Sequence, residues 1–429
     1  MKILVQKILY ILAKMVLKKY KPDVVGITGS MGKTSTKEAV FAVLSSRFRV
    51  RKNLKNYNNE LGVPLSILGT ESGYKSFLKW LGVIFHGLKL ILLRDANYPE
   101  ILVLEMGADH PGDIKYLTDL APCKIGVVTG IGPAHLEFFE SIDKIFKEKR
   151  MIVSHLGQNG FAVLNRDDEK VYEMREKTRA KIVSYGFDLA ADVRAQEESV
   201  IGSGVKIEGM NFKLSYAGAV VPIFIPNVLG RQHIYAALAG AAVGIIYRMN
   251  LVEIAESLKN YQAPKGRMNL VPGIKNTLII DDTYNASPIP AERALEVLRS
   301  IILPEEDKKF AVLGDMLELG SFSEEGHRQV GRAAAKNKVD YLITVGEKSR
   351  DIARAALEGG MAEDKVFNFP APEEAGRFAQ NKIKQGDIIL IKGSQGMWME
   401  KVVKELMAEP LRACDLLVRQ DKEWACKRS

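Results

Sequence analysis

The clearest indication of the fold is the stretch Gly26-Ile27-Thr28-Gly29-Ser30-Met31-Gly32-Lys33-Thr34-Ser35. It follows an apolar run over 23–28, which predicts a strand, and it opens a helical pattern over about 32–47. Backbone N–H groups and the dipole at the start of such a helix favour bound phosphate. Lys33 would neutralise the β and γ phosphate oxygens of a nucleotide, and the Thr34 hydroxyl would bind Mg²⁺. We therefore expect nucleotide contacts from Gly29, Ser30, Met31, Gly32, Lys33, Thr34 and Ser35.

This loop departs from the strict pattern G-x-x-x-x-G-K-[ST], because Ile27 stands where the first glycine is required. The nearest glycines are Gly26 and Gly29. A chance Gly-Lys-Thr on a surface loop is the alternative, and the preceding strand and following helix argue against it. Kinases, GTPases, motors and ligases all use such loops, so other residues must define the reaction.

The rest of the chain alternates short apolar runs with helical stretches, which predicts α/β architecture with mainly parallel sheets. Residues 191–225 are an exception, since glycines separate short β-prone runs there and predict small antiparallel hairpins. The alternation restarts after residue 264. We expect an N-terminal basic amphipathic helix over 1–22, a central nucleotide-binding domain over 23–264, and a Rossmann-like α/β domain over 265–429.

Composition narrows the functional class. The chain has 429 residues, 47% of them hydrophobic, three cysteines and a net charge of +9. Three scattered cysteines provide neither a disulfide framework nor a zinc cluster and favour a cytoplasmic setting. The positive charge favours anionic partners, but we find no nucleic-acid-binding module and expect no nucleic acid partner.

Two apolar segments carry lysines. Residues 1–22 contain Lys7 and Lys14 within an apolar run, which argues against a membrane span, and no signal-peptide cleavage site follows. Two interpretations stay open: a helix docked on its own protein, or a basic helix lying on a membrane surface. Residues 77–93 are similarly apolar and predict a buried or interfacial helix.

Polar residues follow several predicted strands. Glu105 ends the apolar run 101–105 and could bind Mg²⁺ there, although an ordinary polar strand end has the same appearance. His135 lies in a glycine-rich turn after another strand and could be a metal or substrate ligand, or purely structural. Lys149 follows on a helix, where alone it would indicate a solvated charged face.

The second domain repeats this arrangement. Asp281 and Asp282 end a strand and could bind ribose hydroxyls or a metal, while the following residues could equally cap a helix. Two further loops after strands carry polar residues, and together the three clusters predict a substrate cleft at one sheet edge. Their candidate residues are Tyr284, Asn285, Asp315, Glu318, Lys392 and Ser394.

Taken together, these motifs resemble the Mur ligase family, most closely its MurF-type members, over residues 23 to about 405. The resemblance is specific because many short motifs occur in the family's order. They are Gly29–Ser35, Asn56–Pro64, Leu104–Gly107 with His110–Gly112, His135–Glu137 with Lys149, Gly266-Arg267, Asp281–Ala286, Gly314–Met316 with Glu318–Gly320, and Lys392–Ser394.

The resemblance implies an ATP-dependent ligase that forms a carbon–nitrogen bond. A carboxylate is phosphorylated to an acyl phosphate, and an amine then attacks it, releasing phosphate. MurF-type members join D-alanyl-D-alanine to a UDP-N-acetylmuramoyl-tripeptide in peptidoglycan synthesis. The expected cofactors are ATP and Mg²⁺, and the expected partners are a muramoyl-peptide acid and D-alanyl-D-alanine. One alternative is a ligase of the same family that acts on a different or lipid-linked muropeptide acid. The other, from a different functional class, is a non-catalytic nucleotide- or nucleic-acid-binding protein.

The resemblance also assigns roles to residues. Thr34 and Glu105 would hold one Mg²⁺ and His135 a second, with Lys149 as a further metal partner if carbamylated. Arg267 would reach the γ-phosphate and Asp281 the ribose. The implied catalytic set is Lys33, Glu105, His135, Lys149 and Arg267, and Asn58 and Asn59 join the substrate-binding residues.

Four departures from the family pattern stand out. His233 occupies a place where the family usually has an asparagine that contacts the base. Gly130 and Gln395 replace an expected Asn and Arg. Only about 22 residues precede the phosphate loop, where MurF-type enzymes usually carry a UDP-sugar-binding domain, so we expect that domain to be lacking.

Overall fold

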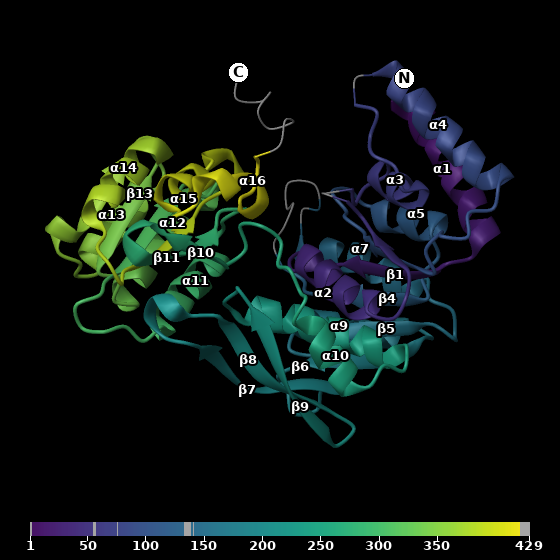
Figure 1. The fold of residues 1–429 in the computed structure, drawn as a ribbon, viewed down its shortest axis with the longest axis horizontal. Coiled ribbons are helices and arrows are strands. Elements are labelled where there is room, and N and C mark those ends of the chain that lie inside the picture. Colours follow the sequence, from purple (N-terminus) through teal and green to yellow (C-terminus); the bar gives the residue numbers. More distant parts are fainter. Residues whose placement is uncertain (1, 55–56, 75, 133–138, 140, 421–429) are drawn as a thin grey trace. The chain divides into compact units, whose positions relative to one another are not determined.

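Strand β1 (Asp23–Thr28) occupies an inner position of the first sheet and leads into the phosphate loop (Figure 1). The structure is a computed structural model that describes residues 2–54, 57–74, 76–132, 139 and 141–420. In the described part of the chain this sheet has the strand order β2-β3-β1-β4-β5-β6-β7-β8-β9. The strands are β2 (Val50–Lys52), β3 (Ile101–Glu105), β4 (Ile125–Val128), β5 (Phe161–Asn165), β6 (Lys181–Gly186), β7 (Val193–Ile201), β8 (Gly209–Tyr216) and β9 (Ala219–Pro226).

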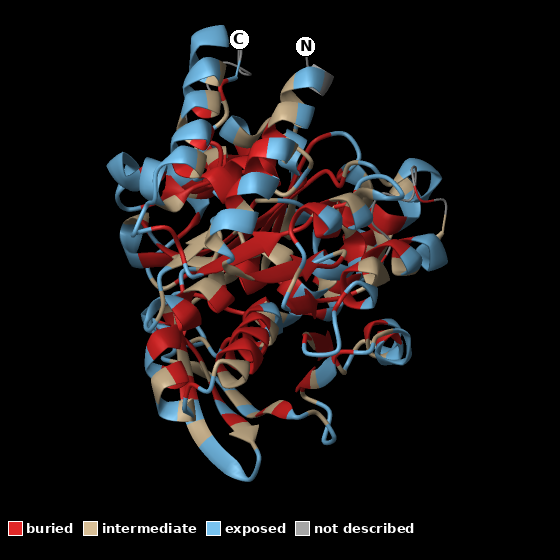
Figure 2. Cartoon of the chain, turned by 90° about the vertical axis from the view of Figure 1, so that its right-hand side faces the viewer, coloured by how far each residue is buried: buried red, intermediate tan, exposed pale blue. Residues whose placement is uncertain are grey.

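The strands from β2 to β6 pair in parallel, so their carboxyl ends meet at one sheet edge. Both faces of such a sheet are covered, which explains the nearly continuous apolar runs in the sequence. Figure 2 shows buried residues concentrated in the strands and exposed residues on the outer helices. The helices before residue 263 are α1 (Lys2–Tyr20), α2 (Lys33–Ser45), α3 (Gly62–Leu68), α4 (Phe77–Leu92), α5 (Asp113–Leu120), α7 (Ile142–Ser154), α8 (Glu169–Glu173), α9 (Arg231–Ile246) and α10 (Leu251–Leu258).

The end of this sheet carries the small hairpins expected between residues 191 and 225. Strands β8 and β9 are joined by the two-residue turn Ala217-Gly218, with φ of 48° and 84°. Positive φ at both central residues is the geometry that matches the twist of a tight hairpin. The fold class predicted from the sequence is therefore confirmed.

The second sheet has the order β10-β11-β15-β12-β13-β14 among the described residues. Between the named strands of the described residues in this sheet, β10 and β11 pair antiparallel and the other neighbours pair in parallel. Strand β15, the last strand of the described residues, lies between β11 and β12. The elements are β10 (Asn269–Gly273), β11 (Thr277–Asp282), β12 (Lys309–Gly314), β13 (Tyr341–Val345), β14 (Val366–Phe369), β15 (Ile388–Lys392), α11 (Pro288–Ser300), α12 (Ser323–Lys336), α13 (Arg350–Glu358), α14 (Pro372–Lys382), α15 (Glu400–Leu406) and α16 (Ala413–Leu416).

The chain divides into two compact units. The first comprises residues 1–197, 212–224 and 232–262, and the second comprises 198–211, 225–231 and 263–429. The second unit thus includes parts of β7, β8 and β9 that precede residue 264. The domain boundary expected between residues 264 and 265 stays a prediction.

Helix α1 docks on its own unit. Leu9, Leu12, Ala13 and Val16 are buried, and the helix packs against α3 and α4. The Lys19 ammonium donates to the carbonyl oxygens of Leu90, Ile91 and Leu93 near the end of α4. None of the described helices is both long enough and apolar enough to span a bilayer.

Candidate nucleotide and ligase site

The phosphate loop connects β1 to α2 and requires glycine at two positions. Gly29 has φ of +147°, and a Cβ there would lie 2.1 Å from Thr129 Oγ1. Gly32, with φ of +79°, immediately precedes the first residue of α2. A side chain at either position would be strained, so the backbone conformation requires glycine at both.

Ile27 explains the departure from the strict loop pattern. It is still within β1, fully buried, and paired in register with Glu105 on β3. A glycine is unnecessary there because the chain has not yet begun to turn.

The loop is supported by the segment after β4. Ser30 N donates to Gly130 O over 2.8 Å, and Ser30 Oγ donates to Gly132 O over 3.0 Å. Lys33 begins α2 and donates from Nζ to Gly29 O over 2.8 Å, so its ammonium lies against the loop. Thr34 follows on the same first turn, Ser35 is buried, and Met31 is exposed.

Glu105 lies at the carboxyl end of β3, next to β1. Its Oε1 accepts a hydrogen bond of 3.0 Å from Asn58 Nδ2. Asn53 accepts from Glu105 N and donates to Glu105 O, which fixes the backbone of the strand end. Glu105 is 4% exposed, and no lysine or arginine of the described residues forms an ion pair with it. A buried carboxylate without a basic partner is a suitable ligand for a divalent cation.

Lys149 on α7 is also buried, with Nζ 3.4 Å from Ala108 O. Burial, together with the nearby charge of Lys33, lowers the pKa of Lys149 to about 7. The neighbouring Glu148 accepts from the backbone N–H groups of Gly112 and Ile114 and so fixes α7 against the start of α5. His135, the other predicted metal ligand, lies outside the described residues.

Two predicted contact residues have clear local roles. Asn59 Oδ1 accepts from Leu61 N and Gly62 N at the start of α3. The His233 ring on α9 is fully buried, with Nδ1 2.9 Å from Tyr261 Oη. The expected substrate and base contacts of these side chains stay predictions.

In the second unit, Asp281 ends the buried part of β11 and is itself fully buried. Its Oδ1 accepts from Thr283 Oγ1 over 2.6 Å and from Thr283 N over 3.1 Å. Its Oδ2 has no hydrogen-bond partner in the described part of the chain. Burial raises the pKa of Asp281 to about 7.

Lys392 connects neighbouring strand ends. Its Nζ lies 2.6 Å from Asp282 Oδ2 and donates to Asn285 O over 2.9 Å. The Arg267 guanidinium stacks over the Tyr284 ring, 4.2 Å from its centroid. Lys392 on β15 therefore fixes the turn that follows β11.

The end of β12 lies close to the same loop. Ser394 Oγ donates to Ala286 O and accepts from Leu317 N, while Ser394 N donates to Asp315 O. The Asp315 carboxylate accepts from Ser349 N over 2.7 Å. Glu318 is exposed in this loop with φ of +63°. The three polar clusters predicted from the sequence are thus carried by strands β11, β12 and β15, which are neighbours in one sheet.

Comparison with known proteins identifies the family. Residues 86–244 match the Mur ligase middle domain, and residues 266–395 match the Mur ligase, glutamate ligase domain. A UDP-N-acetylmuramoyl-tripeptide–D-alanyl-D-alanine ligase of Bacillus subtilis is 31% identical over 403 residues, covering 93% of this chain and 79% of that protein. The chain belongs to the Mur ligase family.

Solved structures agree with this assignment. MurF from Thermotoga maritima in complex with ADP aligns with a TM-score of 0.75 at 28% identity, covering 93% of this Mur ligase and 83% of that chain. MurF from Acinetobacter baumannii aligns with a TM-score of 0.73 at 29% identity, covering 92% and 79%.

The sequence did not reveal every residue that shapes the site of this Mur ligase. Arg419 donates to Glu400 through Nε and Nη2, and Nη2 also donates to Thr283 O over 2.6 Å. Both partners of this ion pair are buried. Arg419 thereby holds the backbone beside Asp281, but no local pattern marks two residues that become partners only through the fold. Asn53 could have been found, because it follows β2 at the edge where Glu105 lies.

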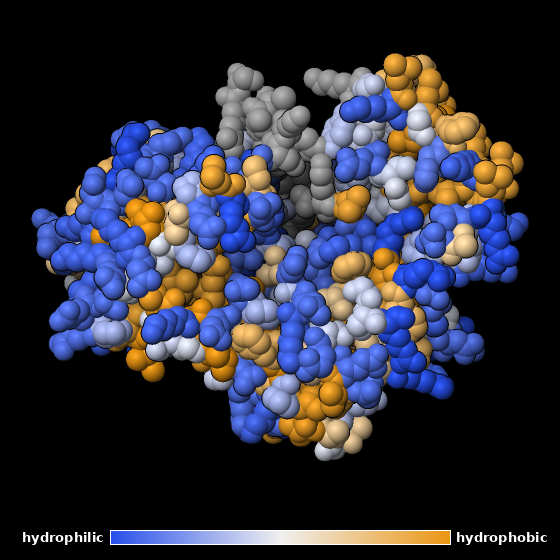
Figure 3. Space-filling view, viewed as in Figure 1, coloured by the Kyte–Doolittle hydropathy of each residue, from blue (hydrophilic) through white to orange (hydrophobic). Residues whose placement is uncertain are grey.

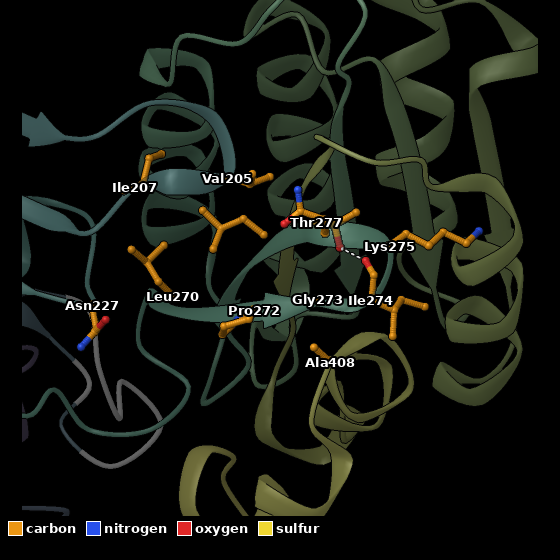
Figure 4. A pocket seen from close by; sticks show the side chains of 12 residues that line it. Val205, Ile207, Asn227, Leu270, Pro272, Gly273, Ile274, Lys275, Thr277 and Ala408 are labelled. Atoms are coloured by element: carbon orange, nitrogen blue, oxygen red, sulfur yellow. Dashed lines mark hydrogen bonds between the residues drawn. The ribbon is translucent and has the colours of Figure 1, made fainter.

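A cavity of about 540 Å³ in the second unit is separate from this edge (Figure 4). It is lined by Val205, Leu270, Lys275 and Thr277, among others, and Thr277 is the first residue of β11. Asp281 and Asp282 lie at the other end of that strand. The cavity is therefore not part of the candidate ligase site.

Proposed function

We propose that this Mur ligase uses ATP to join D-alanyl-D-alanine to a UDP-N-acetylmuramoyl-tripeptide in peptidoglycan precursor synthesis. The observation that carries the proposal is the parallel register of β1 and β3, in which Ile27 pairs with Glu105. This register brings the buried Glu105 carboxylate, which forms no ion pair among the described residues, next to the phosphate loop in a chain similar to ligases of this kind.

Lys33 and the loop supply the nucleotide contacts. The Lys33 ammonium, held against Gly29 O, supplies positive charge where β and γ phosphates would bind. The buried Glu105 carboxylate and the Thr34 hydroxyl are suitable Mg²⁺ ligands, and we propose them as the metal site with His135. Bound Mg²⁺ would neutralise phosphate charge. We propose a γ-phosphate contact for Arg267 and a ribose contact for Asp281.

The reaction has two steps. A carboxylate oxygen of the acid substrate attacks the γ-phosphorus, the bond to the bridging oxygen breaks, and ADP leaves. The amine of D-alanyl-D-alanine then attacks the acyl carbon, phosphate leaves, and the nitrogen loses a proton. Two anions must approach each other in the first step, so the positive charge of Lys33 would stabilise its transition state.

We propose that Lys149 becomes carbamylated. A neutral amine adds to CO₂ and releases one proton, and the lowered pKa of Lys149 makes the neutral amine abundant near pH 7. The buried carbamate would carry a negative charge and could act as a further metal ligand. It would also replace the repulsion between Lys149 and Lys33 by attraction.

An omission assay tests the function. Purified protein is incubated with ATP, Mg²⁺, UDP-N-acetylmuramoyl-tripeptide and D-alanyl-D-alanine, and phosphate release is measured with each component left out in turn. Phosphate release that requires both the acid and the amine supports the proposal. Activity only with a lipid-linked muramoyl-peptide would favour the alternative acid substrate, and no ligation with either acid would contradict the assignment.

A further inference from the structure

Helix α4 has an unusual apolar outer face. Its inner face, which includes Val83, Gly87 and Leu90, is buried. The outer residues recur at spacings of three and four, so they form one continuous stripe along the helix. The exposed fractions along this stripe are 77% for Leu78, 45% for Leu81, 71% for Phe85, 43% for Leu88 and 78% for Leu92.

This stripe forms part of a larger surface. Helix α1 lies beside α4, and its exposed side chains include Leu4, Ile11 and Met15 (Figure 1). Figure 3 shows hydrophobic residues gathered where Figure 1 places α4. Contiguous exposed apolar surface of this kind usually marks a protein or membrane contact.

The charge of the segments that contain α1 and α4 indicates whether this surface contacts a protein or a membrane. Residues 1–22 and 77–94 contain no aspartate or glutamate, but they contain nine lysines and arginines. Lys7, Lys14, Lys79 and Lys89 are exposed. A second copy of this chain would bring the same positive charge to the interface, whereas an anionic surface would be complementary.

We propose that the outer face of α1 and α4 docks on an anionic lipid bilayer. The apolar stripe would enter the interface between headgroups and acyl chains, and the lysines would contact the headgroups. Helix α4 has 16 residues, and no described helix qualifies as a span, so the helices would lie along the surface. The inference stands apart from the ligase proposal, because it uses none of the nucleotide or substrate residues.

Point variants on α4 test the proposed membrane contact better than deletion of α1 does. Deleting α1 would remove buried residues such as Leu9 and Val16 from the first unit. The variant Leu78→Glu/Phe85→Glu instead changes two strongly exposed side chains on the stripe. Ile302→Glu/Leu411→Glu is the matched control, since these exposed residues lie in the second unit.

The full chain is sedimented with vesicles of phosphatidylglycerol and phosphatidylcholine, or of phosphatidylcholine alone. We expect binding to the anionic vesicles that falls with added salt. The Leu78→Glu/Phe85→Glu variant should bind them about tenfold less than the native chain. The control should bind like the native chain, and circular dichroism should show that both variants are folded.

Three outcomes would overturn the proposal: no binding by the native chain, equal binding to neutral vesicles, or undiminished binding by the folded α4 variant. Light scattering tests whether a second copy of this chain binds the same surface. A native dimer that the α4 variant converts to a monomer, without vesicle binding, would make this face a self-association surface. Ligation of soluble substrates, measured in parallel, reports on the proposed function separately.

Discussion

Asn58 donates its side-chain amide to the Glu105 carboxylate, and this bond of 3.0 Å orients the proposed metal ligand. The same loop is tied to the strand end by the bond from Gly107 N to Asn58 O, at 2.7 Å. Partners that orient a ligand commonly change metal affinity or activity by about 10–100-fold when removed.

Asn58→Ala should therefore raise the Mg²⁺ concentration needed for half-maximal ligation by about tenfold. Magnesium titrations at saturating ATP measure this effect. Asn97→Ala, at an exposed position in the same unit, is the control and should leave the titration unchanged. An unchanged titration for Asn58→Ala would remove the orienting role.

Lys33→Ala should reduce turnover at least about a hundredfold while the chain stays folded, because the variant lacks the charge that we propose for phosphate binding. Initial rates of phosphate release and a thermal melt check the two parts of this expectation. Lys115→Ala, which removes only an exposed pair with Asp119, should retain native activity. Retained amide synthesis in Lys33→Ala would contradict the phosphate-loop assignment.

Lys149 should react with CO₂ increasingly as the pH rises through about 7, because the neutral amine is the reactive form. Carbon-13 NMR with labelled bicarbonate should show a carbamate signal that is stronger at pH 8 than at pH 6. The signal should be missing from Lys149→Arg, whose side chain stays protonated. A native spectrum identical to that of the variant at both pH values would exclude the modification.

Asp281 should give the protein a distinctive pH dependence of stability. Its pKa is about 7 in the folded chain against an ordinary 3.8, so the folded state keeps a proton that the unfolded state releases. The free energy of unfolding should consequently fall as the pH rises from about 4 to about 7, by up to about 4 kcal/mol, and stay level above that. Calorimetry should show this loss in the native chain and not in Asp281→Asn. If the free energy of unfolding fell with pH equally in the native chain and in Asp281→Asn, Asp281 would not be the cause of the loss.

Breaking the buried pair of Arg419 and Glu400 should destabilise the second unit by about 3–5 kcal/mol, because one charge is left buried alone. Chemical denaturation of Arg419→Met measures this loss. The double variant Arg419→Met/Glu400→Met should be more stable than either single variant. If the double variant instead loses the sum of the unfolding free energies lost by the two single variants, the two side chains act independently.

Much of the fold was accessible from the sequence because apolar periodicity and glycine-rich turns are local signals. The strand predicted over 23–28 coincides with β1, and the strand predicted to end at Asp281 and Asp282 is β11. Sequence order could not predict that β15 inserts between β11 and β12, since that choice depends on packing between distant segments.

The candidate site was accessible where its residues follow strands. Glu105, Asp281 and Lys392 were found because each ends an apolar run. The bond from Asn58 to Glu105 spans 47 positions and the ion pair from Arg419 to Glu400 spans 19. Both separations exceed the spacing within one helix or strand, so no local spacing rule reveals these contacts. Burial likewise had to come from the structure, and it is burial that gives Lys149 and Asp281 their altered pKa values.

The three hydrogen bonds from Lys19 to the carbonyl oxygens near the end of α4 have a consequence for local unfolding. Opening α1 would strip those carbonyls of their partner and expose the buried side of α4 at the same moment. The two helices should therefore exchange their amide hydrogens as a single cooperative segment. Although α1 is the first element of the chain, it would then behave as an integral part of the first unit and not as a frayed terminus.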